Sequence, residues 1–282
     1  MNIAELLATA ALPASDTPTL DAELLLAHCL GRNRSYLRAF GERAVDAASE
    51  QKFRELLARR ARGEPVAHLL GVREFWSLAL DVDASTLIPR PDTERLVEVA
   101  LEIVDAAREP CDDNPCAVLD LGTGTGAIAL ALASERPHWH LLGVDRSPQA
   151  VQLARRNAQK LSLQRVEFFV SDWFAAIEPA RRFDLIVANP PYIAADDPHL
   201  TQGDVRFEPH SALVAARNGL ADIEQIIEQA PQHLTKRGWL LLEHGWQQAA
   251  DVRALLQRNG FIDVRSWRDY GDNERVSGGR RP

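Results

Sequence analysis

An alternation of short apolar segments with helical segments constrains the fold of this chain more than any other feature of its sequence. The apolar segments are AVLDLG (117–122), HLLGVD (140–145), VEFFVSD (166–172), FDLIVANPP (183–191) and GWLLLEHG (238–245). The segments between them, such as 147–160 and 221–234, carry their apolar side chains at helical spacing. Apolar strands that alternate with helices form a parallel sheet with helices on both faces. The sequence therefore predicts an α/β fold with a doubly wound, Rossmann-like sheet.

The amino-terminal residues have a different pattern. Apolar side chains recur at helical spacing in 3–10, 20–30 and 46–62, and the last two segments stop at a glycine. Residues 66–82 are rich in aromatic and β-branched side chains, which predicts a hairpin. We therefore expect three parts, namely a small all-α domain (1–75), a β-hairpin linker (76–90) and the α/β domain (91–282). Within the last part we expect a helix at 92–107 and two carboxyl-terminal strands, joined by a Gly-Asp-Asn turn, at 261–280.

Charge and hydropathy exclude several classes of protein. The net charge is −8, and residues 1–75 contain ten basic and ten acidic residues, so neither part has the basic surface that duplex nucleic acid requires. No apolar run approaches the roughly 20 residues of a membrane span. The chain begins without the basic stretch of a signal peptide. We expect a cytoplasmic monomer that contacts neither nucleic acid nor a membrane.

The three cysteines, Cys29, Cys111 and Cys116, are too few for a disulfide framework. Cys111 and Cys116 bracket a polar loop that has no nearby histidine or further cysteine to complete a metal shell. We therefore interpret this segment as a connecting loop and predict no metal site.

A glycine-rich loop, Gly122-Thr123-Gly124-Thr125-Gly126, follows the first strand of the α/β domain. Glycines allow a sharp reversal of the chain and a close approach of its backbone to a ligand. Asp145 ends the next strand, where a carboxylate can bind ribose hydroxyls, so the pattern predicts a nucleoside site. Gly122, Gly124 and Ala127 also satisfy the NAD-binding pattern. Asp120 favours a nucleoside ligand that carries an ammonium group over NAD, because a carboxylate facing the cleft would attract an ammonium group and repel a pyrophosphate.

Asn189-Pro190-Pro191-Tyr192 follows the fourth strand, at the sheet edge where ligands bind in such folds. The Asn189 side chain and the Pro190 carbonyl can each accept one N–H of a planar –NH₂ group, which would orient that weakly nucleophilic nitrogen. The two prolines hold these acceptors rigidly, and Tyr192 can stack on the flat acceptor group. Adenine and glutamine both carry such a nitrogen, so the motif alone leaves nucleic acid and protein substrates open.

Val118–Gly126 and Gly143–Asp145 resemble the cofactor motifs of S-adenosylmethionine-dependent methyltransferases. Together with the helical domain, the segments IPRPDTE (88–94), NPPYI (189–193), RFEP (206–209) and RDYGDNERV (268–276) resemble bacterial peptide chain release factor glutamine methyltransferases. The resemblance covers residues 3–280. It implies a Rossmann-like methyltransferase sheet with S-adenosyl-L-methionine as cofactor, and peptide chain release factors as partners. The implied reaction is methylation of the glutamine in their Gly-Gly-Gln motif.

The resemblance also implies the roles of individual residues. The cofactor would contact Gly122 to Gly126, Asp145, Trp173 and Asn189. The substrate glutamine would lie on Asn189, Pro190, Pro191 and Tyr192, with Asn189, Pro190 and Tyr192 as the catalytic residues. Adenine N6-methylation of DNA or RNA remains the alternative activity.

The sequence leaves some roles open. Asp92 and Thr93 can cap a helix or line the pocket, and Glu208 can end a loop or line the pocket. Glu243 and His244, at the end of the fifth strand, are expected to be structural. We expect the helical domain to recognise the protein substrate.

Overall fold

The predicted sheet is present in the computed structural model, which describes residues 1–13, 15–107, 115–201 and 203–282. Seven strands lie in the order β5-β4-β3-β6-β7-β9-β8. Their bounds are β3 Ala117–Leu121, β4 His140–Asp145, β5 Glu167–Val170, β6 Phe183–Ala188, β7 Leu234–Glu243, β8 Ile262–Arg268 and β9 Glu274–Arg280. The strands from β5 to β7 are parallel to one another, whereas β9 is antiparallel to both β7 and β8. Because β3 pairs with both β4 and β6, the order of the strands reverses at β3.

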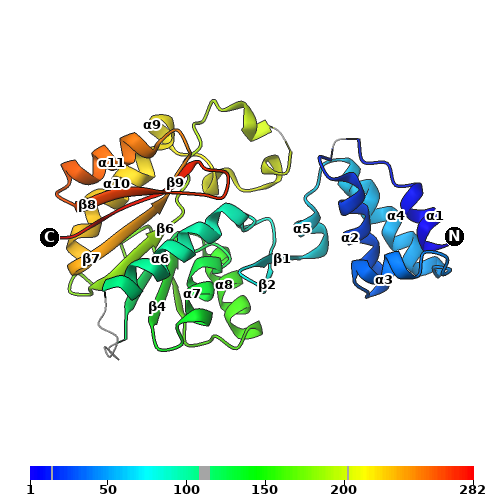
Figure 1. Cartoon of the computed structure of the whole chain (residues 1–282), viewed down its shortest axis with the longest axis horizontal. Helices are drawn as coiled ribbons and strands as arrows, with labels where there is room; N and C mark the ends of the chain where they lie inside the picture. Colours follow the sequence, from blue (N-terminus) through cyan, green and yellow to red (C-terminus); the bar gives the residue numbers. More distant parts are fainter. Residues whose placement is uncertain (14, 108–114, 202) are drawn as a thin grey trace. The chain divides into compact units, whose positions relative to one another are not determined.

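Helices cover both faces of this sheet (Figure 1). One face packs against α6 Glu94–Ala107, α7 Ala127–Glu135 and α8 Pro148–Lys160. The other packs against α10 Ala221–His233 and α11 Ala249–Arg258. Shorter elements of this part are the strands β1 Val72–Phe75 and β2 Leu78–Asp81, the 3₁₀ turns η1 Pro91–Thr93 and η4 His210–Ala212, and the helix α9 Ala216–Gly219. This arrangement buries β3 on both faces, as its continuous apolar pattern predicted.

The described residues divide into two units. Unit 1 consists of Met1–Val72 and Pro198–Phe207, and unit 2 of Arg73–Asp197 and Glu208–Pro282. The segment 198–207 is inserted in the sequence of the α/β part, yet it belongs to the helical unit. Arg60 holds it there, because its guanidinium bonds Asp21 at 2.7 Å and Asp204 at 2.7 Å while only 11% of its side chain is exposed.

Unit 1 is a bundle of short helices around Leu6, Leu25, Leu26 and Phe53. Its helices are α1 Ile3–Ala8, α2 Pro18–Leu30, α3 Arg34–Ala39, α4 Ala47–Ala61 and α5 Val66–Leu70, followed by the 3₁₀ turns η2 Pro198–Thr201 and η3 Val205–Phe207. The helix predicted at 46–62 is confirmed as α4, and the Asp46 side chain caps it by accepting the Ser49 N–H. The pattern did not predict α3, which has only six residues.

The prediction of a hairpin over 66–82 was wrong for its first residues. Val66–Leu70 forms α5, which begins after Pro65 and ends at Gly71 with a left-handed backbone (φ +69°). Ala67 and Leu69 are buried, so the demands of packing outweigh the β-branched composition. The hairpin itself is β1 and β2, at 72–81.

The two carboxyl-terminal strands were predicted correctly. β8 and β9 pair in antiparallel fashion, and the turn between them places Asp272 in the left-handed region (φ 63°). No helix in the described ranges is long and apolar enough to cross a membrane. Cys111 lies outside the described residues, so the prediction for the Cys111–Cys116 segment stays a prediction.

Candidate functional site

A cavity in unit 2 opens at the carboxyl ends of β3, β4 and β6, the point at which the strand order reverses. Three groups of residues line it. They are the segment that leads into and through η1 (Ser85, Thr86, Leu87, Pro89, Arg90, Thr93), the strand-end loops with the first residues of the helices that follow them (Gly122 to Thr125, Ala127, Ile128, Asp145 to Ser147, Ala150, Ser171 to Trp173, Asn189, Pro191), and Ser211 and Ala212 of η4. From the second group the sequence predicted Gly122 to Thr125, Asp145, Trp173, Asn189 and Pro191 as site residues, and it left the roles of 88–94 open.

The glycine loop has the backbone that its composition predicted. Gly122, Gly124 and Gly126 have φ values of +70°, +55° and +83°, which side chains other than glycine rarely adopt. A Cβ at Gly122 would lie 3.3 Å from the Trp173 indole. The loop thus places unhindered backbone against the cavity, as close approach of a ligand requires.

Asp120 lies beneath this loop rather than in the cavity. Its side chain is fully buried, its Oδ2 accepts the Thr123 hydroxyl at 2.6 Å, and its Oδ1 has no hydrogen-bond partner among the described residues. Burial raises the pKa of Asp120 to about 7, although the Thr123 hydrogen bond opposes this shift. The expectation that this carboxylate faces the cleft is therefore not met. In the structure Asp120 braces the loop through Thr123.

Asp145 does line the cavity, and the backbone fixes its carboxylate. Its Oδ2 accepts the Gly124 N–H at 3.0 Å and its Oδ1 accepts the Ser147 N–H at 2.9 Å. Burial raises the pKa of Asp145, while these two backbone bonds favour its charged form. A carboxylate has about four acceptor positions, so Asp145 keeps capacity for two hydroxyl groups of a ligand.

Trp173 follows β5 with a left-handed backbone (φ 46°), and only 9% of it is exposed. Its indole packs against Gly122 and lines the cavity together with Asp172. The structure therefore brings Trp173 to the glycine loop and Asp145, as the sequence predicted for a nucleoside site.

The four residues after β6 divide between the cavity and the protein interior. Asn189 and Pro191 line the cavity, whereas Pro190 is buried and Tyr192 is half-buried, and neither of these two lines it. The Asn189 Nδ2 donates to the Thr93 Oγ1 at 3.1 Å, so the amide oxygen Oδ1 points away from Thr93. The Tyr192 hydroxyl donates to Glu243 Oε1 at 3.3 Å, and burial raises the pKa of Tyr192.

The segment 88–94 takes a direct part in the site, which sequence reasoning had left open. Thr93 holds the Asn189 amide, and Arg90 lines the cavity while its Nη2 bonds both oxygens of Glu208 at 2.8 and 3.0 Å. Glu208 is buried (5% exposed) and anchors Arg90 without lining the cavity. The only sequence signal for these roles was the motif itself, because Thr93 and Glu208 meet partners far away in the chain.

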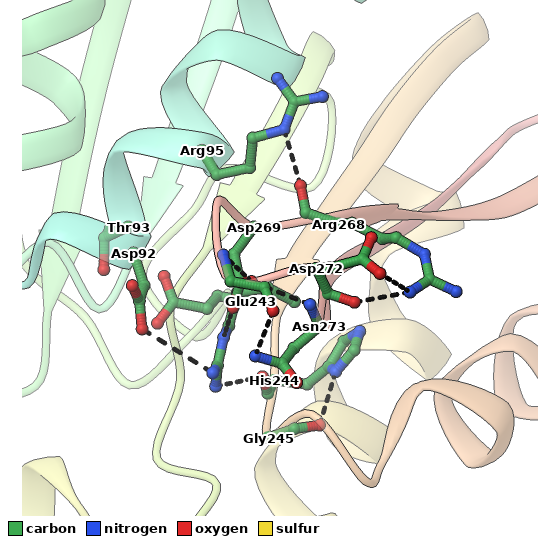
Figure 2. A network of polar contacts seen from close by, with 12 residues as sticks. Asp92, Thr93, Arg95, Glu243, His244, Gly245, Arg268, Asp269, Asp272 and Asn273 are labelled. Atoms are coloured by element: carbon green, nitrogen blue, oxygen red, sulfur yellow. Dashed lines mark hydrogen bonds and ion pairs between the residues drawn. The ribbon is translucent and has the colours of Figure 1, made fainter.

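The turn between β8 and β9 supports the same edge of the sheet (Figure 2). Asp269 accepts backbone N–H groups of its own turn and, at 3.2 Å, the Nε of Arg275. Arg275 also forms an ion pair with Asp92 at 3.7 Å. His244 bonds Gly245 O and Ser277 Oγ, and burial lowers its pKa to about 4, so it is a neutral structural group as predicted.

The geometry of this site suits the transfer of a group to a planar nitrogen of a substrate better than covalent catalysis by a nucleophilic side chain. The Asn189 amide, held through its Nδ2 by Thr93, lines the cavity next to the glycine loop. Among the described residues, no cluster of three or more His, Cys, Asp or Glu side chains could hold a metal ion.

Comparisons with known proteins identify related sequences. Residues 112–270 match a family described as a methyltransferase domain, and residues 5–71 match the PrmC N-terminal domain. The release factor glutamine methyltransferase of Escherichia coli (strain K12) is 57% identical over 269 residues, covering 95% of this chain and 94% of that protein. The protein of that name from Pseudomonas aeruginosa is 55% identical over 279 residues, with 99% and 98% covered.

Solved structures share the fold at low sequence identity. A methyltransferase from Pyrococcus furiosus aligns with a TM-score of 0.51 and 16% identity, covering 79% of this chain and 96% of that one. The hMettl16 catalytic domain in complex with MAT2A 3′UTR hairpin 6 aligns with a TM-score of 0.56 and 18% identity, covering 80% and 81%. With the family matches, these likenesses confirm the predicted Rossmann-like methyltransferase fold.

The buried carboxyl of Asp120 gives a testable pH dependence. A carboxyl whose pKa rises on folding stabilises the protein below its unfolded pKa of about 4, and this contribution is lost as the pH rises through about 7. The neutral variant Asp120→Asn lacks this loss. The unfolding free energy of the variant should therefore increase relative to that of the wild type between pH 4 and pH 8, as measured by urea unfolding. A difference that stays constant over this range would contradict the assignment.

Proposed function

The chain belongs to the release factor glutamine methyltransferase family, and on that premise we propose its reaction. It transfers a methyl group from S-adenosyl-L-methionine to the side-chain amide nitrogen of the glutamine in the Gly-Gly-Gln motif of peptide chain release factors. The observation that carries the proposal is the Asn189 amide, whose N–H is bonded to Thr93 and whose oxygen is left for an N–H of the substrate. Adenine N6-methylation, the alternative, is not favoured by these relatives.

The residues around the cavity fit the cofactor. The glycine loop at Gly122 to Gly126 leaves room that a Cβ would fill, and Asp145 offers a carboxylate already held by backbone N–H groups. In this proposal Thr123 and Thr125 hold the shape of the loop, Asp145 binds the ribose hydroxyls, and the indole of Trp173 bounds the adenine. S-Adenosyl-L-methionine supplies an electrophilic methyl group when it is bound.

Asn189, Pro190 and Tyr192 prepare the glutamine nitrogen in this mechanism. The Asn189 Oδ1 and the Pro190 carbonyl each accept one N–H, which turns the nitrogen lone pair toward the methyl group and stabilises the positive charge that develops on nitrogen. Pro191 gives the cavity wall against which the glutamine lies. Tyr192 does not line the cavity, so in this mechanism it supports the motif from behind, where its bond to Glu243 fixes the ring. The C–N bond would form as the methyl–sulfur bond breaks, S-adenosyl-L-homocysteine would leave with that electron pair, and the nitrogen would then release a proton to solvent.

Three further properties belong to the proposal. The protein acts as a monomer, works in the cytoplasm and makes no direct contact with nucleic acid. The net charge of −8, of which residues 1–75 contribute none, supports the last point. The helical unit 1 recognises the body of the release factor, and unit 2 carries out the transfer.

Removal of the ribose-binding carboxylate tests the cofactor site. Asp145→Ala loses two charge-assisted hydrogen bonds of about 1.5–3 kcal/mol each, so we expect S-adenosyl-L-methionine to bind at least about tenfold more weakly. Isothermal titration calorimetry measures this change. Asp184→Asn is the matched control, because Asp184 bonds Ala117 N and Thr235 Oγ1 at the opposite end of the sheet. An unchanged affinity in Asp145→Ala would remove the residue from the cofactor site.

Asn189→Ala tests the proposed acceptor. It should lower kcat by about 10²–10³ while raising KM for the release factor much less, because the lost bond strengthens as charge develops on nitrogen. Asn189→Asp keeps an acceptor for the substrate N–H, so this variant should retain more activity than the Ala variant. Single-turnover methyl transfer at saturating cofactor measures both. Equal rates for wild type and Ala would exclude Asn189 from the mechanism.

A chain that begins at Arg73 tests the role of unit 1. It should bind S-adenosyl-L-methionine with a Kd within about threefold of the full chain, since the cavity lies wholly in unit 2. Methylation of intact release factor should be almost abolished. Full activity in the shortened chain would show that recognition resides elsewhere.

A further inference from the structure

A buried carboxyl group lies behind the Asn189 motif and is not used by the mechanism above. Glu243 ends β7, its residue is 1% exposed, and its side chain extends toward Asp92 and Thr93 of η1 (Figure 2). Burying a carboxyl group lowers the stability of the fold unless polar groups form hydrogen bonds or ion pairs with it. Its Oε1 accepts the Tyr192 hydroxyl at 3.3 Å, whereas its Oε2 has no hydrogen bond of ordinary geometry among the described residues.

The surroundings of Glu243 place its pKa near neutral pH. Burial raises its pKa to about 7, and the charge of Asp92 adds to this shift. The Thr93 hydroxyl, the Arg275 guanidinium and the Tyr192 hydroxyl oppose it. These groups come from η1, from β9 and from the loop after β6, so three separate parts of the chain converge on this one carboxyl.

Thr93 connects Glu243 to the reactive edge of the cavity. A threonine hydroxyl has a single hydrogen to donate and two lone pairs to accept with. One lone pair of Thr93 accepts the Asn189 Nδ2–H at 3.1 Å. The hydroxyl hydrogen is therefore available to another acceptor. The Glu243 side chain extends toward Thr93 (Figure 2), its Oε2 is buried without a hydrogen-bond partner among the described residues, and the Thr93 hydroxyl lowers the pKa of Glu243. Thr93 is 4% exposed, so water does not compete for it.

We propose that the Glu243 carboxylate, acting through the Thr93 hydroxyl, sets the orientation of the Asn189 amide and is thus a positioning residue for methyl transfer. This inference rests on the function proposed above. An ionised Glu243 takes the Thr93 hydrogen, so Thr93 can only accept from Asn189, and the amide oxygen Oδ1 must face the substrate. A protonated Glu243 donates to Thr93 instead. The Thr93 hydrogen then turns to Asn189 and binds Oδ1, which presents the Asn189 NH₂ to the substrate NH₂.

Variants at the two ends of this connection give the test. Glu243→Gln and Thr93→Val should each lower kcat about tenfold, which is the loss of one hydrogen bond, with KM for the release factor and the Kd of S-adenosyl-L-methionine within about twofold of wild type. Thr93→Ser keeps the hydroxyl and should restore most of kcat. The double variant Glu243→Gln/Thr93→Val should be no slower than the slower single variant, because both substitutions remove the same effect.

The pH profile separates positioning from mere support of the fold. The wild-type kcat should rise with pH to a plateau above about 7, as Glu243 ionises beside Tyr192, Arg275 and Asp92. Glu243→Gln should lack this rise. Asp184→Asn, which replaces a carboxylate at the other end of β6, should lower Tm without changing kcat.

The possible outcomes distinguish a failure of the proposed function from a failure of the positioning role. A wild-type protein that binds S-adenosyl-L-methionine but does not methylate release factor would overturn the proposed function itself. An active wild type whose Glu243→Gln and Thr93→Val variants keep full kcat would overturn only the positioning role. The same holds if those variants lose kcat in proportion to Tm and cofactor binding, or if Thr93→Ser behaves as Thr93→Val does.

Discussion

The pairing of β3 with β4 on one side and β6 on the other is the interaction on which the site depends. Val118 is in register with Leu141 of β4 and with Leu185 of β6, so the three strands end at the same edge. Their first loop residues are the glycine loop, the residues after Asp145, and Asn189. Parallel pairing therefore brings segments separated by more than sixty residues to one edge. The Gly124–Asp145 hydrogen bond then joins two of these loops, and the segment before α6 and η4 complete the cavity.

The same edge concentrates carboxyl groups that are buried, as Asp120 and Glu243 are, or partly buried, as Asp145 is. Burial raises the pKa of Asp120, Asp145 and Glu243, and in each case burial is the largest cause. Each has its own compensation. The Thr123 hydroxyl meets Asp120, two backbone N–H groups meet Asp145, and two hydroxyls with Arg275 meet Glu243. Such an edge gives up stability to hold oriented acceptors in a partly buried site, where a hydrogen bond to a developing charge is stronger than in bulk water.

The sequence predicted the parts of the fold that local pattern determines. The strands, the covering helices, the glycine loop and the position of Asn189 all follow from apolar spacing and from residue types with special backbone preferences. The α5 helix escaped prediction because the burial of Ala67 and Leu69 depends on helices distant in the sequence. Asp120 was placed in the cleft because a strand end has two faces, and only the packing of Thr123 decides between them. The contact of Thr93 with Asn189 spans 96 positions, so no spacing rule could reveal it.

Two segments, 88–94 and 268–276, contain no catalytic nucleophile. They support the edge of the cavity at Asn189 from opposite sides. The segment 88–94 supplies Arg90, which is anchored by Glu208, and Thr93, which holds Asn189. The turn at 268–276 supplies Arg275, which is fixed by Asp269 and faces Asp92 and Glu243. Asn189 has a symmetrical amide shape, so its position alone does not decide which end accepts and which donates. Only the hydrogen-bond partners behind it can make that choice. In the proposal made above, the residues that fix the polarity of the motif at 189–192 therefore lie outside it, with Thr93 in η1 and Glu243 at the end of β7.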